Sequence, residues 1–511
     1  MLVDRRAIEL EDPIGIRVLG ARIVGELKLG YVHARVPLVL RKCAIPEEIE
    51  LGYAELPELN LDGSYTDEIY APGIKVDGVL RIGEGFHAAG AVFMADATID
   101  GDADFGGGHF NHSKGTPREW PASLFWMTVV DPALVLSYAR FRATLVMCCG
   151  FESQGAVGLF NSSVAGDVLF FGSRFIGTKG LALAMAATEI TGDMNFTDQF
   201  LGVSPPFHPS EFKGIVDFTT AQFGRGVIFA GTRFTGAPSE PHGLFALETN
   251  IKGTMMWVNV ALTNDAFLNL QGAQVASLID DTESWPKPGK LQIGGLKYQS
   301  LFSAGPNSNL PAVAATVPDA RTRLRWIGLN TPPSPQPFDQ LANYFRGIGS
   351  NAQADEVLIA RDDMLNSNSD WPNYLWGKFL KITIGYGHKP LRAIIWSMLV
   401  VAIGTVMVAA GKRAGVMRLT WPETTPPPAS DPTEELNPVL YSLDVFLPFV
   451  NLHQEHYWWP AKSVSGKCVV LGWPVRIRGS FLRLYLWGQI IVGWLLSAIF
   501  LAAVTGLIRN D

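Results

Sequence analysis

One short segment carries the ionisable groups that a pathway through a membrane would need. Residues 441–452 read Tyr-Ser-Leu-Asp-Val-Phe-Leu-Pro-Phe-Val-Asn-Leu, an apolar run interrupted by Asp444 and Pro448. The run is too short to cross a bilayer, but such a piece can re-enter the membrane where protein shields it, and an ionisable group there indicates a pathway. The alternative, which we favour, is a segment lying flat at the membrane surface. The candidate pathway residues are Tyr441, Asp444, Pro448 and Glu455.

A second run, Thr383-Ile-Gly-Tyr-Gly387, resembles the selectivity filter of potassium channels, in which carbonyl oxygens replace the water shell of the ion. Its candidate residues are Thr383, Gly385, Tyr386 and Gly387. A filter lies between two membrane helices, whereas this run precedes the first long apolar stretch. We therefore favour a glycine-rich joint between an amphipathic segment and a membrane helix.

Motifs for metals and cofactors are incomplete. His109-x-x-His112 and His453-x-x-His456 each supply two ligands, whereas a closed zinc site needs four. Gly83-Glu84-Gly85 lacks the third glycine of a dinucleotide fingerprint, and the alternating Asp100, Asp102 and Asp104 are not followed by the glutamate of an EF-hand loop. We predict no catalytic, cofactor-binding or metal residues and no cofactor, and we favour a chain that is not an enzyme.

Composition narrows the class of protein further. The 511 residues carry a net charge of −7 without a basic cluster in the repeat region, which argues against nucleic-acid binding. Only four cysteines occur, and the adjacent Cys148 and Cys149 would face opposite ways on a strand. A disulfide framework is therefore not expected, and a reducing compartment is the default. Residues 1–20 lack the continuous apolar core of a signal peptide.

A short sequence repeat, here called the repeated phrase, determines the architecture of most of the chain. Gly78-Val-Leu-Arg-Ile, Gly90-Ala-Val-Phe-Met and Gly101-Asp-Ala-Asp-Phe begin 12 and 11 residues apart, each with apolar residues two positions apart. Such a short period predicts a parallel β-solenoid in which two apolar side chains of each strand point inward, and we expect the solenoid to be right-handed. Two strands would form a coil of about 22 residues, giving roughly ten coils. Each glycine would serve a corner that needs positive φ or close backbone approach.

The C-terminal third changes character. Proline-rich residues 330–337 mark a linker, helical spacing follows, and two long apolar stretches flanked by Trp, Tyr, Lys and Arg predict membrane helices. The N-terminal part is predicted to comprise a cap at 1–20, the solenoid at 21–300 with insertions near 106–121 and 204–210, and a linker at 301–337. A helical hairpin adaptor at 338–366 and an interfacial amphipathic segment at 371–390 are expected to follow. The predicted membrane helices are 391–411 and 484–508, joined by a loop at 412–483 that contains the re-entrant or interfacial segment 439–452.

Orientation follows from the missing signal peptide. Exporting a long β-domain ahead of the first membrane helix would need dedicated machinery, so we expect a two-pass protein of the inner membrane with the solenoid and both termini in the cytoplasm. Basic residues are slightly more numerous in the connecting loop, but the positive-inside rule is weak for a loop of that length.

Several phrases, taken in order, resemble one family. They are Ser284-Trp-Pro286 with Gly289, Leu291, Gly294, Leu296 and Tyr298; Tyr344-Phe-Arg346 with Gly349 and Val357-Leu-Ile-Ala360; Thr383-Ile-Gly-Tyr-Gly387 with Pro390; and Tyr441-Ser-Leu-Asp444 with Leu447-Pro448 and Gln454-Glu455. Together they resemble bacterial membrane-associated proteins with a pentapeptide-like β-solenoid and a two-helix membrane anchor. Members are often labelled membrane-associated oxidoreductases, but the family pattern offers no cofactor site that transfers to a residue here.

These patterns lead to three functional hypotheses. The first is a membrane-anchored, non-catalytic scaffold or sensor, whose partners are the lipid bilayer and a protein bound to the solenoid. The second is a channel or transporter subunit in which the two-span domain forms a homo-oligomer around a pore. The third is an oxidoreductase whose cofactor site the sequence does not reveal.

Overall fold

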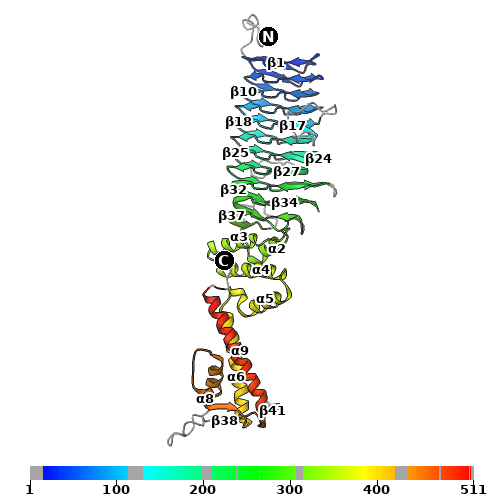
Figure 1. Ribbon diagram of the computed structural model, residues 1–511. Coiled ribbons are helices and arrows are strands. Elements are labelled where there is room, and N and C mark those ends of the chain that lie inside the picture. The colour runs from blue at the N-terminus through cyan, green and yellow to red at the C-terminus, as the bar shows by residue number, and fades with distance from the viewer. Residues whose placement is uncertain are drawn as a thin grey trace. The chain divides into compact units, whose positions relative to one another are not determined.

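The structure is a computed structural model that describes residues 15–112, 131–197, 209–236, 240–263, 265–305, 315–419, 436–470, 473–505 and 507. The chain divides into two compact units, Met1–Ala354 and Asp355–Asp511. The first unit consists of β-strands followed by helices, and the second is mainly helical with two small β-pairs (Figure 1).

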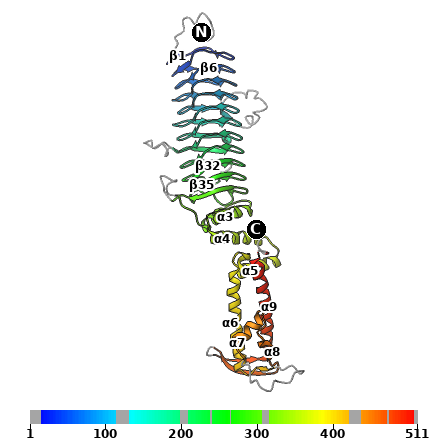
Figure 2. The same ribbon diagram turned by 90° about the vertical axis from the view of Figure 1, so that its left-hand side faces the viewer.

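Short parallel strands in successive coils build most of the first unit (Figure 2). Strand β11 (Leu80–Arg81) pairs with β7 (Leu59–Asn60) on one side and with β15 (Ala103–Asp104) on the other, so the chain returns to the same place after 21 and 23 residues. These pairings join 19 strands into one sheet and 18 into another, and neither sheet closes on itself. The parallel architecture and the predicted coil length of about 22 residues are confirmed.

The structure corrects the expected number of strands per coil from two to four. Strands β6 (Glu55–Leu56), β7, β8 (Tyr65–Thr66) and β9 (Ile69–Tyr70) complete one coil before β10 (Lys75–Val76) pairs with β6. Each 11-residue phrase therefore contains two strands with a bend between them. Later coils also contain longer strands: β24 (Arg174–Ala184), β27 (Glu211–Asp217), β32 (Asn250–Trp257), β35 (Gln274–Asp280) and β37 (Lys297–Ser303).

Apolar side chains fill the inside of the coils. Leu59 with Leu61 and Leu80 with Ile82 are fully buried inward pairs. Aromatic rings stack through the later coils, with centroids 5.1 Å apart for Phe170 and Phe196. Burial of these side chains supplies the main stabilisation of the stack.

One corner of the coils is a column of residues in the left-handed region. The backbone N–H of each donates to a carbonyl of the next coil, as Tyr31 does to Gly52 and Tyr53 does to Pro72, at 2.8 Å in both cases. This hydrogen bonding keeps the column in register from coil to coil. Its non-glycine members have φ between 52° and 63°: Tyr31, Tyr53, Asp96, Tyr138, Asn161, Ala187, Thr220 and Glu248.

The glycines of the repeated phrase allow the backbones of neighbouring coils to approach each other closely. A Cβ on Gly78 would lie 2.6 Å from the carbonyl oxygen of Pro57, and one on Gly101 would lie 2.6 Å from that of Gly78. None of Gly78, Gly90 and Gly101 is among the residues with positive φ. Of the two roles expected for these glycines, the contacts therefore support close backbone approach.

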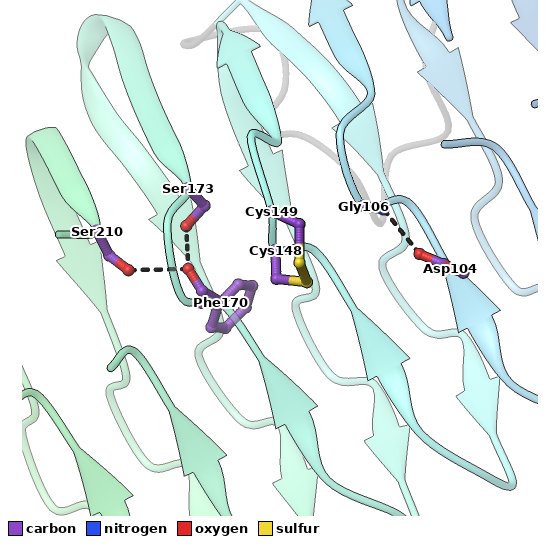
Figure 3. The surroundings of a disulfide bond; sticks show 7 residues. All are labelled: Asp104, Gly106, Cys148, Cys149, Phe170, Ser173 and Ser210. Atoms are coloured by element: carbon purple, nitrogen blue, oxygen red, sulfur yellow. Dashed lines mark hydrogen bonds between the residues drawn. A yellow bond between two sulfur atoms is a disulfide. The ribbon is translucent and has the colours of Figure 1, made fainter. Parts of the chain in front are cut away.

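Cys148 and Cys149 form a disulfide bond between adjacent residues (Figure 3). They lie at a corner, where Cys149 has φ of 63°, and not on a strand. The expectation that the two side chains face opposite ways is therefore wrong, because the alternation of a strand does not apply where the chain turns.

Both predicted insertions lie partly outside the described residues. Residues 113–121 and 204–208 are not described, whereas 106–112 include strand β16 (His109–Asn111) and belong to a regular coil. Ser210 is buried, and its hydroxyl donates to the carbonyl of Phe170 at 2.8 Å (Figure 3). The chain therefore rejoins the stack at Ser210.

Helices follow the last strand of the first unit. The range expected as a linker, 301–337, contains helix α2 (Ala320–Ile327), and α3 (Gln336–Gly347) begins at its end. Asn330 Oδ1 accepts from the N–H of Ile293 at 2.8 Å, and Gln336 Oε1 accepts from that of Gly295 at 2.7 Å. These side chains attach the segment to the final coil. Helices α3 and α4 (Asn351–Ser367) cover the range predicted for the hairpin.

The second unit contains two helices that are long and apolar enough to cross a membrane. They are α6 (Leu391–Arg413) and α9 (Gly479–Val504). The predicted spans were 391–411 and 484–508, so the second helix begins five residues earlier than expected. The remaining elements are α5 (Trp371–Ile384), α7 (Pro438–Phe446), α8 (Gln454–Tyr457) and the antiparallel pairs of β38 (Met417–Leu419) with β39 (Trp458–Pro460) and of β40 (Ser465–Val470) with β41 (Trp473–Arg478).

Candidate functional site

Helix α7 packs against the middle of both long apolar helices. The hydroxyl of Ser442 donates to the carbonyl of Val401 at 2.8 Å, and Gln489 Nε2 lies 2.9 Å from both Ser442 oxygens. A Cβ on Gly493 would lie only 2.1 Å from the carbonyl oxygen of Phe446. Val401, Gln489 and Gly493 are close to the midpoints of their helices. If α6 and α9 cross a bilayer, this placement favours the re-entrant interpretation of α7 over the surface one.

Two buried polar atoms where α7 packs against α6 and α9 have no hydrogen-bond partner among the described residues. They are Oε1 of Gln489 and the hydroxyl of Tyr441, and both side chains are almost fully buried. A buried polar atom without a partner is unusual and costs free energy. Gln489 is not among the predicted site residues, although a single amide within a long apolar stretch is a signal that could have found it.

The carboxylate of Asp444 closes the loop that follows α7. Its Oδ1 accepts from the N–H of Leu452 at 2.6 Å, and its Oδ2 accepts from the N–H of Glu455 at 3.0 Å. Pro448 lies in the turn between them. Burial, and secondly the Asp444 carboxylate, raise the pKa of Glu455. The structure therefore brings Asp444 and Glu455 together and gives Asp444 a clear role as a loop cap.

The filter-like run forms a tight turn between α5 and α6. Gly385, Tyr386 and Gly387 all have positive φ, of 57°, 55° and 94°. The carbonyl of Gly385 accepts from the N–H of His388 at 3.1 Å, and the hydroxyl of Thr383 donates to Phe379 at 2.8 Å. These groups are engaged within the turn, which supports the interpretation as a glycine-rich joint.

Charged side chains surround this joint. The Tyr386 hydroxyl donates to Asp363 Oδ1 at 3.0 Å, and Lys381 forms an ion pair with the same carboxylate. The preceding residue, Asp362, lies with its Oδ2 3.2 Å from Nε2 of the buried His388. The opposite charges at the joint fix its conformation through contacts with α4.

The residues of the histidine and aspartate motifs either form hydrogen bonds within the coils or have side chains that lie apart from one another. His112 Nδ1 is 2.9 Å from the carbonyl oxygen of Gln154, and the rings of His453 and His456 are 6.3 Å apart. Asp102 accepts from the N–H of Thr144 at 3.0 Å, and Asp104 accepts from that of Gly106 at 2.9 Å (Figure 3). Within the described part of the chain, no three His, Cys, Asp or Glu residues are grouped so that they could hold a metal ion.

A groove on the outer surface of the early coils was not predicted. We call it the tyrosine groove, and its hollow has a volume of about 450 Å³. It combines the left-handed corner column with outward residues of the neighbouring strands. Its aromatic and acidic lining residues are Tyr31, Tyr53, Tyr70, Phe93, Tyr138, Glu50 and Asp96.

The rings of the tyrosine groove stack along the coils. Tyr31 and Tyr53 have ring centroids 5.3 Å apart with planes inclined by 17°, and Tyr70 and Phe93 are 5.3 Å apart at 15°. The Tyr53 ring lies over Gly73, where a Cβ would come within 2.6 Å of two ring carbons. Tyr31 and Tyr53 are nevertheless 74% and 51% exposed. The coils therefore hold the rings of Tyr31 and Tyr53 open to solvent, whereas the ring of Phe93 is buried beneath its neighbours.

Acidic groups dominate this part of the chain. Residues 43–104 contain 14 Asp and Glu residues against two Lys and Arg residues, whereas the whole chain has a net charge of −7. The two charged residues that line the groove, Glu50 and Asp96, are both acidic. A positively charged ligand would therefore be attracted to these coils.

A search against protein-family models, curated proteins and solved structures finds no match to this chain.

Proposed function

We propose that this protein is a membrane-anchored, non-catalytic scaffold or sensor that presents a right-handed, pentapeptide-like β-solenoid to a protein partner in the cytoplasm. The observation that carries the proposal is the tyrosine groove. Exposed tyrosines offer a large contact area at a low cost in conformational entropy, and they are enriched where proteins bind one another. Tyr31 and Tyr53 have the exposure that such a contact requires.

The second unit supplies the anchor in this proposal. Helices α6 and α9 would cross the inner membrane, and α3 and α4 would act as a helical hairpin that connects the solenoid to the anchor. The joint around Tyr386 and Asp363 supports the connecting role, because its hydrogen bonds tie the end of α4 to the turn before α6.

A second candidate function is a subunit of an oligomeric channel or transporter. It is favoured by the position of α7 beside the middle of α6 and α9 and by the amide oxygen of Gln489, which has no hydrogen-bond partner in the described part of the chain. A native mass of the detergent-purified protein and an ion-flux assay in liposomes test it. A ring of four or more copies with measurable flux would favour the channel over the scaffold.

Site-specific photo-crosslinking tests the scaffold. A photoreactive phenylalanine analogue is placed at Tyr31, at Tyr53 or at Tyr65, in membranes of cells that naturally make the protein. Tyr65 is the matched control, because it is an exposed tyrosine stacked on His87 in the same coils but does not line the groove.

We expect one defined protein adduct from positions 31 and 53 and none from position 65. Mass spectrometry of the adduct would identify the partner. The proposal is overturned if positions 31 and 53 give no protein adduct beyond that of position 65.

A further inference from the structure

We propose that the tyrosine groove binds an arginine- or lysine-rich segment of the partner protein; this inference rests on the proposed scaffold function and names the chemistry of its ligand. The groove offers two kinds of contact to such a segment. Stacked rings form its apolar surface, and the carboxylates of Glu50 and Asp96 lie along it.

The geometry suits the amphipathic side chains of arginine and lysine. Their aliphatic stems pack on rings such as Tyr53 and Tyr70, while the charged ends reach carboxylates. Guanidinium groups also stack on aromatic rings and attract them electrostatically. Because the groove runs along the coils, side chains at several positions of an extended segment can make these contacts at once.

The acidic residues of the groove favour a cationic ligand over a neutral one. A neutral oligosaccharide could also stack on tyrosines, but it would gain nothing from the charge of Glu50 and Asp96. Lys28 is the basic residue in register with Glu50; its ion pair is with Glu26, and it also interacts electrostatically with Glu50, whereas Asp96 adds a second carboxylate to the groove. The excess of acidic residues at positions 43–104 adds a long-range attraction that only a cationic segment exploits.

The test measures binding of fluorescein-labelled peptides to the full chain in detergent by anisotropy. The probes are a 12-residue peptide that alternates arginine with glycine, the same peptide with glutamate in place of arginine, and a neutral labelled cellohexaose. We expect binding of the arginine peptide alone, weakened by added salt because the charges are exposed.

Two variants locate the site. The double change Tyr31→Gly with Tyr53→Gly removes both rings at positions whose left-handed backbone suits glycine, so folding is not threatened. It should weaken binding roughly fivefold to thirtyfold, which corresponds to the loss of two exposed cation–π contacts. Glu50→Gln with Asp96→Asn should weaken binding about threefold or more. Tyr65→Ala and Asp62→Asn, which leave the groove intact, should each stay within about twofold of wild type.

The outcomes separate this inference from the proposed function. Equal binding by wild type and the Tyr31/Tyr53 variant, or binding of cellohexaose in place of the arginine peptide, overturns the cationic ligand. If protein adducts nevertheless form at positions 31 and 53, the scaffold stands with a partner of different chemistry. If neither the adducts nor the peptide complex form, both proposals fail.

Discussion

Arg323 of helix α2 forms a buried two-point ion pair with Asp280 at the end of strand β35. The Nη1 atom of Arg323 lies 2.7 Å from Oδ2 of Asp280, and both side chains are almost completely excluded from solvent. Trp285 Nε1 donates to the same carboxylate at 3.1 Å. The pair connects a helix to one of the last coils, so it secures the C-terminal end of the stack.

Removing one partner should be costly. In Asp280→Asn the guanidinium stays buried without a carboxylate, and we expect a loss of about 3–5 kcal/mol in the unfolding free energy of the first unit. Denaturant unfolding of the full chain, followed by tryptophan fluorescence, measures this loss. The control is Asp100→Asn, which breaks the exposed pair with Arg142 and should cost less than about 1 kcal/mol. Equal effects of the two variants would contradict the role of Arg323.

The buried carboxyl of Asp62 should make the folding stability of the protein depend on pH. Burial raises the pKa of its carboxyl, and Oδ2 has no partner among the described residues. The folded state therefore favours the protonated form, which stabilises it below the unfolded pKa of about 3.9 and is lost as pH rises through the folded pKa. Asp62→Asn mimics that form, so it should raise the melting temperature at pH 7 and have little effect near pH 3.

The control for this prediction is Asp77→Asn, because the side chain of Asp77 is 61% exposed. It should show no such difference between the two pH values. A lower melting temperature of Asp62→Asn at pH 7 would show that the carboxylate is stabilising, and would contradict the prediction.

The coil length could be predicted because inward residues such as Leu59 and Leu61 recur with a fixed period. The number of strands could not, because strands of two residues are shorter than the alternation that reveals a strand. The tyrosine groove was not predicted for a related reason. It consists of turn residues and outward-facing residues, and Tyr31 is seen to neighbour Tyr53 only when the sequences of successive coils are aligned. The pair of Arg323 and Asp280 has no local pattern, since 43 residues separate its members.

Composition alone predicted the two long apolar helices of the second unit. Asp444 stood out as a charge in an apolar run, but its hydrogen bonds to Leu452 and Glu455 depend on how the loop closes. The burial of the Gln489 side chain depends on the packing of α7 against α9, which no short-range pattern encodes.

The disulfide between Cys148 and Cys149 can be checked by mass. In protein purified and unfolded without reductant, an alkylating reagent should add to two cysteines only, because Cys43 and Cys468 are free. After reduction it should add to all four. Peptide mapping of the alkylated protein assigns the sites. Four adducts before reduction would show that the two neighbouring cysteines are thiols.

Gly493 and Gly488 should respond in opposite ways to alanine. A Cβ on Gly493 would collide with the backbone of Phe446, so Gly493→Ala should destabilise the packing of α7 by about 1–3 kcal/mol. Outside the helix's own backbone, no atom of the described residues lies within 4 Å of the corresponding position at Gly488, where alanine should instead stabilise the helix slightly. Thermal unfolding in detergent, followed by fluorescence, compares them. Equal shifts for the two variants would argue against the contact between α7 and α9.

Asp444→Asn distinguishes a loop cap from a pore residue. An amide has only one oxygen, so the N–H of either Leu452 or Glu455 loses its acceptor, at a cost of about 1.5–3 kcal/mol. Amide exchange of the 447–455 loop should therefore accelerate roughly tenfold to hundredfold. Glu455→Gln is the control, because it removes a nearby charge but no N–H acceptor and should leave exchange unchanged. If Asp444 lined a pore instead, Asp444→Asn would abolish ion flux in liposomes while exchange of the loop stayed the same.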